Sequence, residues 1–294
     1  MQIVSKGLVF TYNSKAEFQR QALQGVDLTV EDGDFFGIVG ETGSGKSTFI
    51  QHLNGLIKVQ GGSLNVGKFD LVPTDKKAQK EYKKMLKELR YKVGMVFQYP
   101  EYQLFAETVY DDVCFGVENF FPTLSKQEVD ERVKKAIELV GLDYEKVKNK
   151  SPFDLSGGQK RRVAIAGILV SEPDVLVLDE PVAGLDPIGK KRLMSLLHTL
   201  HDTKIVKTII IVSHDMDEIS ENVNRVALFS NGKAVKVCSP KELFSTKDES
   251  AERLGLPVTA YLTEQLKKVG VEINSDYKIE NFINQTIKEY KKRV

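Results

Sequence analysis

Residues 40–47 read Gly40-Glu41-Thr42-Gly43-Ser44-Gly45-Lys46-Ser47, and this stretch fits the pattern GxxxxGK followed by Ser or Thr in full. A short apolar run, 35–39, precedes it, and a helix-like stretch, 46–56, follows it. The glycines allow backbone N–H groups to turn inward around phosphate oxygens, and the start of the helix adds a favourable partial charge. In this context we expect Lys46 to reach the β- and γ-phosphates of a nucleotide and the Ser47 hydroxyl to bind Mg²⁺. The stretch therefore predicts a P-loop NTPase fold.

The composition is that of an ordinary globular chain. The 294 residues include 42 basic and 41 acidic side chains, and the resulting net charge of +1 argues against a protein that coats nucleic acid. Two cysteines, Cys114 and Cys238, are too far apart for a metal motif, as is usual in a reducing compartment. The N-terminus lacks the layout of a signal peptide, and the longest aliphatic run, 205–212, is much shorter than the roughly 20 residues that span a membrane. We therefore expect a cytosolic chain without a membrane span.

Apolar runs indicate where the sheet lies. The first 40 residues alternate like strands, and the continuous runs 175–178 and 208–212 are typical of parallel strands covered on both faces. Strands separated by a glycine turn and a helix predict an α/β core. Residues 101–152 have a helical pattern, in which Ser125 and Glu128 are spaced as a capping box.

A charged run occupies residues 75–92, with eight basic and three acidic side chains. The favoured interpretation is the solvated face of a helix, and the alternative is a basic face towards anionic lipid or a partner.

Two carboxylates end the apolar run 175–178. Asp179 is well placed to bind Mg²⁺ through water, and Glu180 to polarise the water that attacks the γ-phosphate. Two adjacent carboxylates would be costly as mere core residues.

A second glycine-containing motif, Leu155-Ser156-Gly157-Gly158-Gln159, precedes a helical apolar run. Ser156 is a predicted N-cap, and the two glycines expose backbone N–H groups at the start of that helix. The chain therefore has two anion-binding helix starts but only one phosphate cradle.

Together with four further matches, these three motifs resemble the ATP-binding cassette (ABC) ATPases at seven places in the expected order. The others are Tyr12 before the cradle, Gln98 after the run 93–97, Asp186 in the segment 183–187 and His214 after the run 209–213. The resemblance implies an ABC ATPase domain over 1–240, with a mixed sheet and a helical subdomain at about 99–160, and a helical C-terminal extension over 241–294.

The resemblance also implies roles for these residues. Tyr12 would stack on adenine, because an aromatic face accepts a base without hydrogen bonding. Gln98 would contact Mg²⁺ and the attacking water, His214 would hold the γ-phosphate beside Glu180, and Asp186 would link two active sites. The implied catalytic set is Lys46, Gln98, Glu180 and His214, and the metal set is Ser47, Gln98 and Asp179. The implied ATP-binding set is Tyr12, Gly40, Glu41, Thr42, Gly43, Ser44, Gly45, Lys46, Ser47, Thr48, Gln98, Ser156, Gly157, Gly158, Gln159 and Asp186. The histidines His52, His198 and His201 match no motif and are expected to be structural.

In ABC ATPases two cassettes enclose two ATP molecules, each between the cradle of one chain and the LSGGQ motif of the other. With one copy of each motif, this chain needs a second chain. ATP would then act as a reversible adhesive between the two.

The sequence of residues 98–116 resembles that of the ATPases of energy-coupling factor (ECF) transporters. Within that group, the pair Arg161-Arg162 is similar to the second, A-prime, ATPase. This resemblance implies three partners: a paralogous ATPase, a transmembrane coupling protein (T component) and a substrate-binding membrane protein (S component). No nucleic acid is implied. The chain would lie on the cytoplasmic face of the membrane and power uptake of vitamins or transition-metal ions, with the solute undefined.

If the coupling protein presents basic helices, Glu101, Asp111 and Asp112 are candidate acceptors. An alternative for Asp111 and Asp112 is that they complement a helix dipole. The tail after Pro240 is predicted to hold the two ATPases together without nucleotide, and the alternative is a peripheral lid over the core.

Two other functions fit the same motifs. One is the cassette of a conventional importer fed by a soluble binding protein. The other is a regulatory nucleotide-binding dimer that does not hydrolyse ATP, which the presence of both Glu180 and His214 disfavours.

Overall fold

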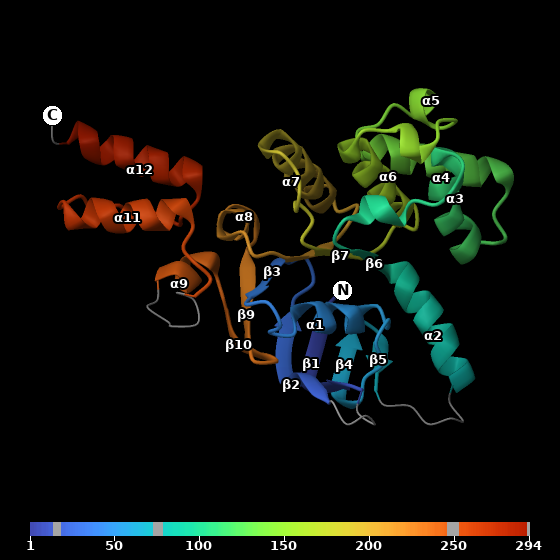
Figure 1. Cartoon of the computed structure of the whole chain (residues 1–294), viewed down its shortest axis with the longest axis horizontal. Helices are drawn as coiled ribbons and strands as arrows, with labels where there is room; N and C mark the ends of the chain where they lie inside the picture. The colour runs from blue at the N-terminus through green and yellow to red at the C-terminus, as the bar shows by residue number, and fades with distance from the viewer. Residues whose placement is uncertain (14–18, 73–78, 246–252, 293–294) are drawn as a thin grey trace.

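The computed structural model describes residues 1–13, 19–72, 79–245 and 253–292, and these residues form two sheets with helices around them (Figure 1). The smaller sheet is antiparallel, with strand order β2-β1-β4-β5. The larger sheet has the order β10-β9-β3-β8-β7-β6, in which only β10 is antiparallel to its neighbour. The strands are β1 (Ile3–Tyr12), β2 (Arg20–Val30), β3 (Phe35–Gly40), β4 (Gly61–Val66), β5 (Phe69–Leu71), β6 (Val93–Val96), β7 (Val175–Asp179), β8 (Thr208–Val212), β9 (Arg225–Ser230) and β10 (Lys233–Cys238).

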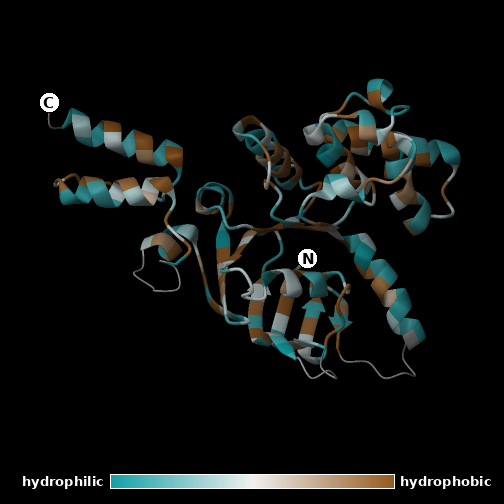
Figure 2. Ribbon diagram, viewed as in Figure 1, coloured by the Kyte–Doolittle hydropathy of each residue, from teal (hydrophilic) through white to brown (hydrophobic). Residues whose placement is uncertain are grey.

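Both faces of the five parallel strands of the larger sheet are buried, as the apolar runs predict, whereas β10 has an exposed face. All of β3 is buried, and its successive side chains point to opposite faces. Phe36 and Ile38 pack with the smaller sheet and with α1 (Lys46–Leu53). Phe35 and Val39 pack into a second core with helices on the other face. The strands, brown in Figure 2, therefore form a hydrophobic layer between two groups of elements.

A helical subdomain lies beyond the β6 edge of this sheet (Figure 1). The predicted capping box is confirmed at its second helix, where Ser125 and Glu128 cap one another. Its elements are η2 (Pro100–Gln103), α3 (Val109–Phe120), α4 (Lys126–Leu139), α5 (Tyr144–Val147), η3 (Pro152–Asp154) and α6 (Gly157–Leu169). Two further helices follow strands of the sheet, namely α7 (Pro187–Asp202) and α8 (Met216–Asn222).

The charged run forms a helix, α2 (Gln79–Lys92), and residues 75–78 lie outside the described residues. Tyr82, Leu86 and Leu89 are buried, whereas Lys83 and Lys87 are exposed. Both interpretations of the charged run predict these exposed lysines, so the choice between a solvated face and a face towards lipid or a partner stays a prediction.

The C-terminal region has three described helices, α9 (Pro240–Ser245), α11 (Val258–Lys268) and α12 (Ile279–Lys291). The backbone N–H groups of Val258 and Ile279 donate to Asp217 and Glu221 of α8, so the base of the α11–α12 pair is fixed to the core. The two helices point away from both sheets, and α12 has no buried residue (Figures 1 and 2). This arrangement does not fit a lid over the core.

Among the described residues, no helix is both long and apolar enough to cross a membrane.

Candidate functional site

The loop between β3 and α1 has a backbone that only glycine suits at two points. Gly40 has φ 152°, and a Cβ atom there would lie 2.3 Å from the carbonyl oxygen of Phe229. Gly45 is the left-handed N-cap of α1, and its Cβ atom would lie 2.6 Å from the carbonyl oxygen of Ala22. Both glycines thus permit a tight turn that leaves the first N–H groups of α1 pointing into the loop.

Lys46 folds over this loop. Its Nζ donates to the carbonyl oxygens of Gly40 at 2.6 Å and Glu41 at 2.9 Å. Burial lowers the pKa of Lys46, and the carboxylates of Glu180 and Asp179 raise it in part. Beneath the loop, the Ser44 hydroxyl is buried and lacks a hydrogen-bond partner among the described residues. The loop therefore contains both a cation and an unpaired polar group, as a phosphate cradle requires.

Asp179 ends β7 beside the start of α1. Burial raises the pKa of Asp179, the Ser47 hydroxyl and Lys46 lower it in part, and Glu180 adds to the increase. Ser47, Lys46 and Asp179 thus form one cluster of a hydroxyl, a cation and a carboxyl group.

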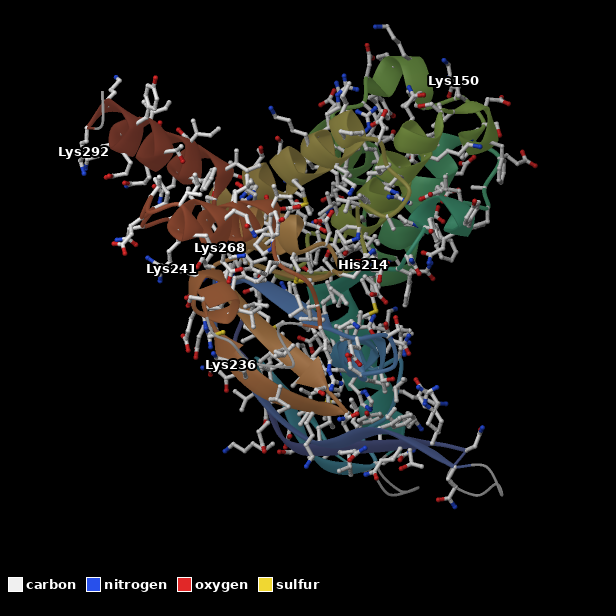
Figure 3. All side chains as sticks on the ribbon, turned by 60° about the vertical axis from the view of Figure 1, so that its left-hand side comes forward. Lys150, His214, Lys236, Lys241, Lys268 and Lys292 are labelled. Carbon is white, nitrogen blue, oxygen red and sulfur yellow. The ribbon has the colours of Figure 1, made fainter. Side chains whose placement is uncertain are left out.

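The side chains of three residues, one after each of three neighbouring strands, meet at Glu180. Its backbone has φ 48°, and its N–H donates to the carbonyl oxygen of Val212 at the end of β8, at 2.9 Å. Its carboxylate accepts a hydrogen bond from Gln98, after β6, at 3.0 Å, and lies 3.1 Å from Nδ1 of His214, after β8. In Figure 3 His214 lies near the middle of the molecule, away from Lys150 and Lys292 at its extremities. Because these strands are parallel neighbours, their carboxyl ends bring the three side chains together.

Tyr12 lies at the end of β1, next to α1. Its hydroxyl lies 3.2 Å from Oγ1 of Thr48, and its ring edge meets Phe10 with centroids 4.8 Å apart. Tyr12 as a whole is 39% exposed.

The LSGGQ segment is separate from these groups. Ser156 and Gln159 form a capping box at the start of α6, and Gly157 and Gly158 have open space at the position of a Cβ atom. This segment borders a cavity of about 1320 Å³ together with Asp186, which caps α7 by accepting from the N–H of Gly189 at 2.6 Å. Within the described residues, no hydrogen bond or ion pair joins the segment to the loop 40–47.

The expected acceptors for basic helices are already engaged. Glu101 forms a two-point ion pair with Arg161, so a basic helix could reach this carboxylate only by sharing or displacing that ion pair. Asp112 accepts from the N–H groups of Phe105 and Ala106. Asp111 lies in the first turn of α3 and accepts from the hydroxyl of its N-cap, Thr108. The helix-start interpretation therefore fits Asp111 and Asp112 better.

The three other histidines make structural contacts. His52 is fully buried and bonds through Nδ1 to the carbonyl oxygen of Thr48 at 2.7 Å. His198 bonds to Asn222, and His201 bonds to the carbonyl oxygen of Gly33.

Two arginines near the site were not singled out by sequence motifs. The guanidinium group of Arg20 approaches the cradle, since a Cβ atom on Gly43 would lie 2.9 Å from it. Arg161 bonds to the loop after Glu180. The only signal in the sequence was the pair Arg161-Arg162, which indicated a subgroup and not a contact.

Comparisons with known proteins identify relatives of this chain. A sequence profile described as ABC transporter matches residues 23–183. The chain is 44% identical over 278 residues to the energy-coupling factor transporter ATP-binding protein EcfA2 of Clostridium tetani, covering 94% of this chain and 92% of that protein. It is 45% identical to the EcfA2 protein of Clostridium perfringens, covering 94% and 93%.

Solved structures give the same grouping. The protein cbiO1 of Clostridium perfringens, part of the ABC transporter complex cbiONQ, superposes with a TM-score of 0.72 at 35% identity, covering 89% of this chain and 98% of that one. The ATP-binding cassette MJ0796, in a dimeric structure bound to ADP and Pi, superposes with a TM-score of 0.69 at 28% identity, covering 81% and 98%.

Proposed function

Since the chain belongs to the ABC transporter family and is an ATPase subunit of an energy-coupling factor transporter, we propose that it supplies half of each ATP hydrolysis site in a pair of ATPases. The observation that carries this proposal is the convergence of Gln98 and His214 on Glu180, while Ser156, Gly157 and Gly158 of the LSGGQ segment lie exposed and apart. Gln98, Glu180 and His214 can act on a nucleotide bound at the loop 40–47 of the same chain. The LSGGQ segment is available to a nucleotide bound to another chain.

Glu180 is the proposed general base. Its carboxylate can take a proton from the water that attacks the γ-phosphate, because Gln98 and His214 each hold one of its two oxygens. Lys46 supplies positive charge to the β- and γ-phosphates, where negative charge develops during the reaction. The adenine would stack on Tyr12.

The residues around Asp179 fit a magnesium ion. A buried carboxyl group beside a serine hydroxyl supplies hard oxygen ligands, and substrate phosphates complete such a site in related chemistry. Ser47, Asp179 and Gln98 would hold Mg²⁺, which neutralises phosphate charge when bound.

The second half of each site would come from the other ATPase, proposed to be a paralogue. Ser156 and the N–H groups at the start of α6 would bind the γ-phosphate held by the partner chain, because a helix start favours negative charge. Asp186 borders the same cavity, so it would lie at the junction of the two sites.

The contact with the transmembrane coupling protein would be largely apolar. A groove of about 380 Å³ lies between η2, α3 and α6, and it is lined on one side by Phe105 and Phe115, whose exposed rings meet edge to face at 5.1 Å. The segment 103–105, which lines this groove, begins five residues after Gln98 in the chain. We therefore assign the T component to this groove, with the S component bound through it, at the cytoplasmic face of a membrane.

The C-terminal region, 241–294, is proposed to hold the two ATPases together. Four apolar side chains along α12 are exposed, namely Ile279, Ile283, Ile287 and Tyr290. Their spacing of three or four residues places them on one face of the helix. The variant Ile283→Asp should weaken nucleotide-free pairing of the ATPases, measured by light scattering. Val235→Asp, at a half-exposed position on β10, is the matched control, and equal pairing of both variants would contradict the assignment.

The function is tested by purifying the chain from membranes. We expect it to be recovered with a second ATPase and two integral membrane proteins, and the complex to release phosphate from ATP. Recovery with a soluble binding protein instead would indicate a conventional importer, and a complex without phosphate release would exclude the proposed activity.

A further inference from the structure

Arg161 is a buried cation that joins three functional segments. It lies on α6, five residues after Ser156, and is 3% exposed. Its Nε and Nη2 donate to the two carboxylate oxygens of Glu101 at 3.0 and 2.9 Å. Its Nη1 donates to the carbonyl oxygens of Pro181 and Ala183, each at 2.9 Å. Four hydrogen bonds from this one planar guanidinium group therefore connect η2 and the loop after Glu180 to α6, the helix that begins at the LSGGQ motif.

The two segments that Arg161 joins also meet at the centre of the site. Gln98 lies three residues before Glu101 and donates to Glu180, which directly precedes Pro181. Glu180 has φ 48° and Gly184 has φ 74°, so both ends of the loop 180–184 have left-handed backbone conformations. For a non-glycine residue such a conformation persists only when surrounding contacts enforce it. Arg161 supplies two of these contacts.

The same ion pair lies next to the groove assigned to the coupling protein. Glu101 belongs to η2, whose last residue, Gln103, lines that groove together with Leu104 and Phe105. An occupant that displaces η2 must therefore move Glu101. Because Glu101 and Arg161 are joined at two points and largely shielded from water, the guanidinium group would move with it.

We propose that Arg161 is a positioning residue for ATP hydrolysis, which holds the loop 180–186 against the segment after Gln98 and transmits movement in the groove to Glu180 and Asp186. The inference rests on the proposed function, because it assumes hydrolysis at Glu180. Lysine cannot replace Arg161 in this role, since a single ammonium group cannot make in-plane bonds to a carboxylate and two carbonyl oxygens at once.

The test compares Arg161→Lys, Glu101→Gln and a matched control in the assembled transporter complex. The control, Asp34→Asn, removes a carboxylate from another arginine ion pair, Arg225–Asp34 at 2.7 Å, which lies at the opposite ends of the strands. The measurements are kcat and KM for ATP and the unfolding temperature of each complex. Arg161→Lys should lower kcat about tenfold by misplacing Glu180, with KM within about twofold of wild type, because Arg161 contacts none of the proposed ATP-binding groups. Glu101→Gln should lower kcat less, because the amide oxygen still accepts a hydrogen bond.

The control should lower the unfolding temperature without changing kcat. Equal kcat for wild type, Arg161→Lys and Glu101→Gln, with unfolding temperatures lowered as in the control, would overturn the inference and leave Arg161 a structural residue. If the Arg161→Lys complex does not assemble, the kcat of the Glu101→Gln complex decides. A kcat equal to that of wild type, with a lowered unfolding temperature, would then overturn the inference. A wild-type complex that does not hydrolyse ATP would remove the proposed function as well, whereas an active wild type with equally active variants removes this inference alone.

Discussion

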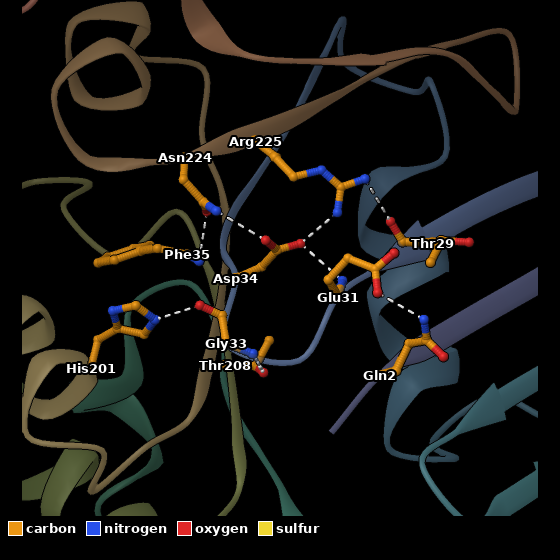
Figure 4. Close-up of polar contacts among 10 residues, drawn as sticks. All are labelled: Gln2, Thr29, Glu31, Gly33, Asp34, Phe35, His201, Thr208, Asn224 and Arg225. Carbon is orange, nitrogen blue, oxygen red and sulfur yellow. Dashed lines mark hydrogen bonds and ion pairs between the residues drawn. The ribbon is translucent and has the colours of Figure 1, made fainter.

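The two ends of the parallel strands in the larger sheet are built in opposite ways. At the amino ends the polar groups satisfy one another. Asp34 accepts from Arg225 at 2.7 Å, from Asn224 at 3.0 Å and from the N–H of Glu31 at 2.9 Å (Figure 4). Near it, His201 and Thr208 bond to the backbone of Gly33. At the start of β7, Asp174 pairs with both Lys92 and Lys207.

The carboxyl ends of the same strands hold polar groups that are incompletely paired. The Ser44 hydroxyl and Oε1 of Glu218 are both buried without a hydrogen-bond partner among the described residues. Burial raises the pKa of Asp179 and lowers the pKa of Lys46, so both charged forms are disfavoured by the same surroundings. The Glu180 backbone is left-handed.

This difference between the two ends of the strands indicates that the amino ends serve stability and the carboxyl ends serve ligand binding. The amino ends contribute hydrogen bonds and ion pairs that need no ligand, whereas the carboxyl ends retain buried polar groups that cost free energy in the free protein. A triphosphate offers acceptor oxygens to the Ser44 hydroxyl and to Lys46, so nucleotide binding should stabilise the folded protein at this end of the sheet. Substitutions at the two ends should therefore have separable effects on rate and stability.

The largest effect is expected at Glu180. The variant Glu180→Gln keeps the shape and the contact with Gln98 but cannot take a proton, so kcat for ATP hydrolysis should fall by about 10²- to 10⁴-fold. Phosphate release by the purified complex measures this, and an ATP-binding assay checks that nucleotide affinity persists. If hydrolysis continued at the wild-type rate, Glu180 would not be the base.

The next effect is a pH dependence of stability at Glu218. Burial raises the pKa of Glu218 from 4.5 to about 7, and a hydrogen bond from Ser213 lowers it in part. The folded protein therefore holds a proton that the unfolded chain has lost. Consequently the free energy of unfolding should fall as pH rises from about 4.5 to about 7, by a total of about 3 kcal/mol, and stay level above that range.

Urea unfolding between pH 5 and pH 8 tests this dependence. Glu218→Gln should flatten the curve, while Glu280→Gln on the exposed face of α12 serves as control and should not. A wild-type curve parallel to that of Glu218→Gln would show that Glu218 does not titrate in this range.

At the amino ends, Asp34→Asn should reduce stability and leave catalysis alone. The substitution leaves Arg225, which is about one-third exposed, without its carboxylate partner, so we expect the free energy of unfolding to fall by about 2 kcal/mol. The comparison of the two ends fails if kcat changes severalfold while the protein remains folded.

Most of the fold could be predicted from the sequence because its signals are local. The apolar runs 35–39, 175–178 and 208–212 became β3, β7 and β8, and the glycine pattern of 40–47 became the turn into α1. The ion pair that Glu101 forms could not be predicted, for a physical reason. Its partner, Arg161, lies 60 residues away in the chain, and no local pattern indicates which arginine a carboxylate will meet.

The arrangement of the site was predictable only in part. That Asp179, Glu180 and His214 follow buried strands is visible in the sequence, and parallel neighbours place their carboxyl ends together. The order of the strands is a tertiary property, so the contacts of Glu180 with Gln98 and His214 required the structure. The separation of Ser156 from the cradle, in contrast, was already implied by the resemblance to ABC ATPases.

The smallest expected effect concerns the edge of the proposed nucleotide site at Tyr12. Tyr12→Phe keeps the stacking face and the edge contact with Phe10 but removes the hydroxyl that lies 3.2 Å from Thr48. One neutral, partly exposed hydrogen bond within the protein contributes roughly 0.5–1 kcal/mol, so the free energy of unfolding should fall by about that amount, while KM for ATP should change less than about twofold because the ring remains. Tyr12→Ala, which also removes the ring, should raise KM for ATP. Equal KM values for Tyr12→Ala and wild type would show that adenine does not stack here, and the functional end of the sheet would then hold the phosphates alone.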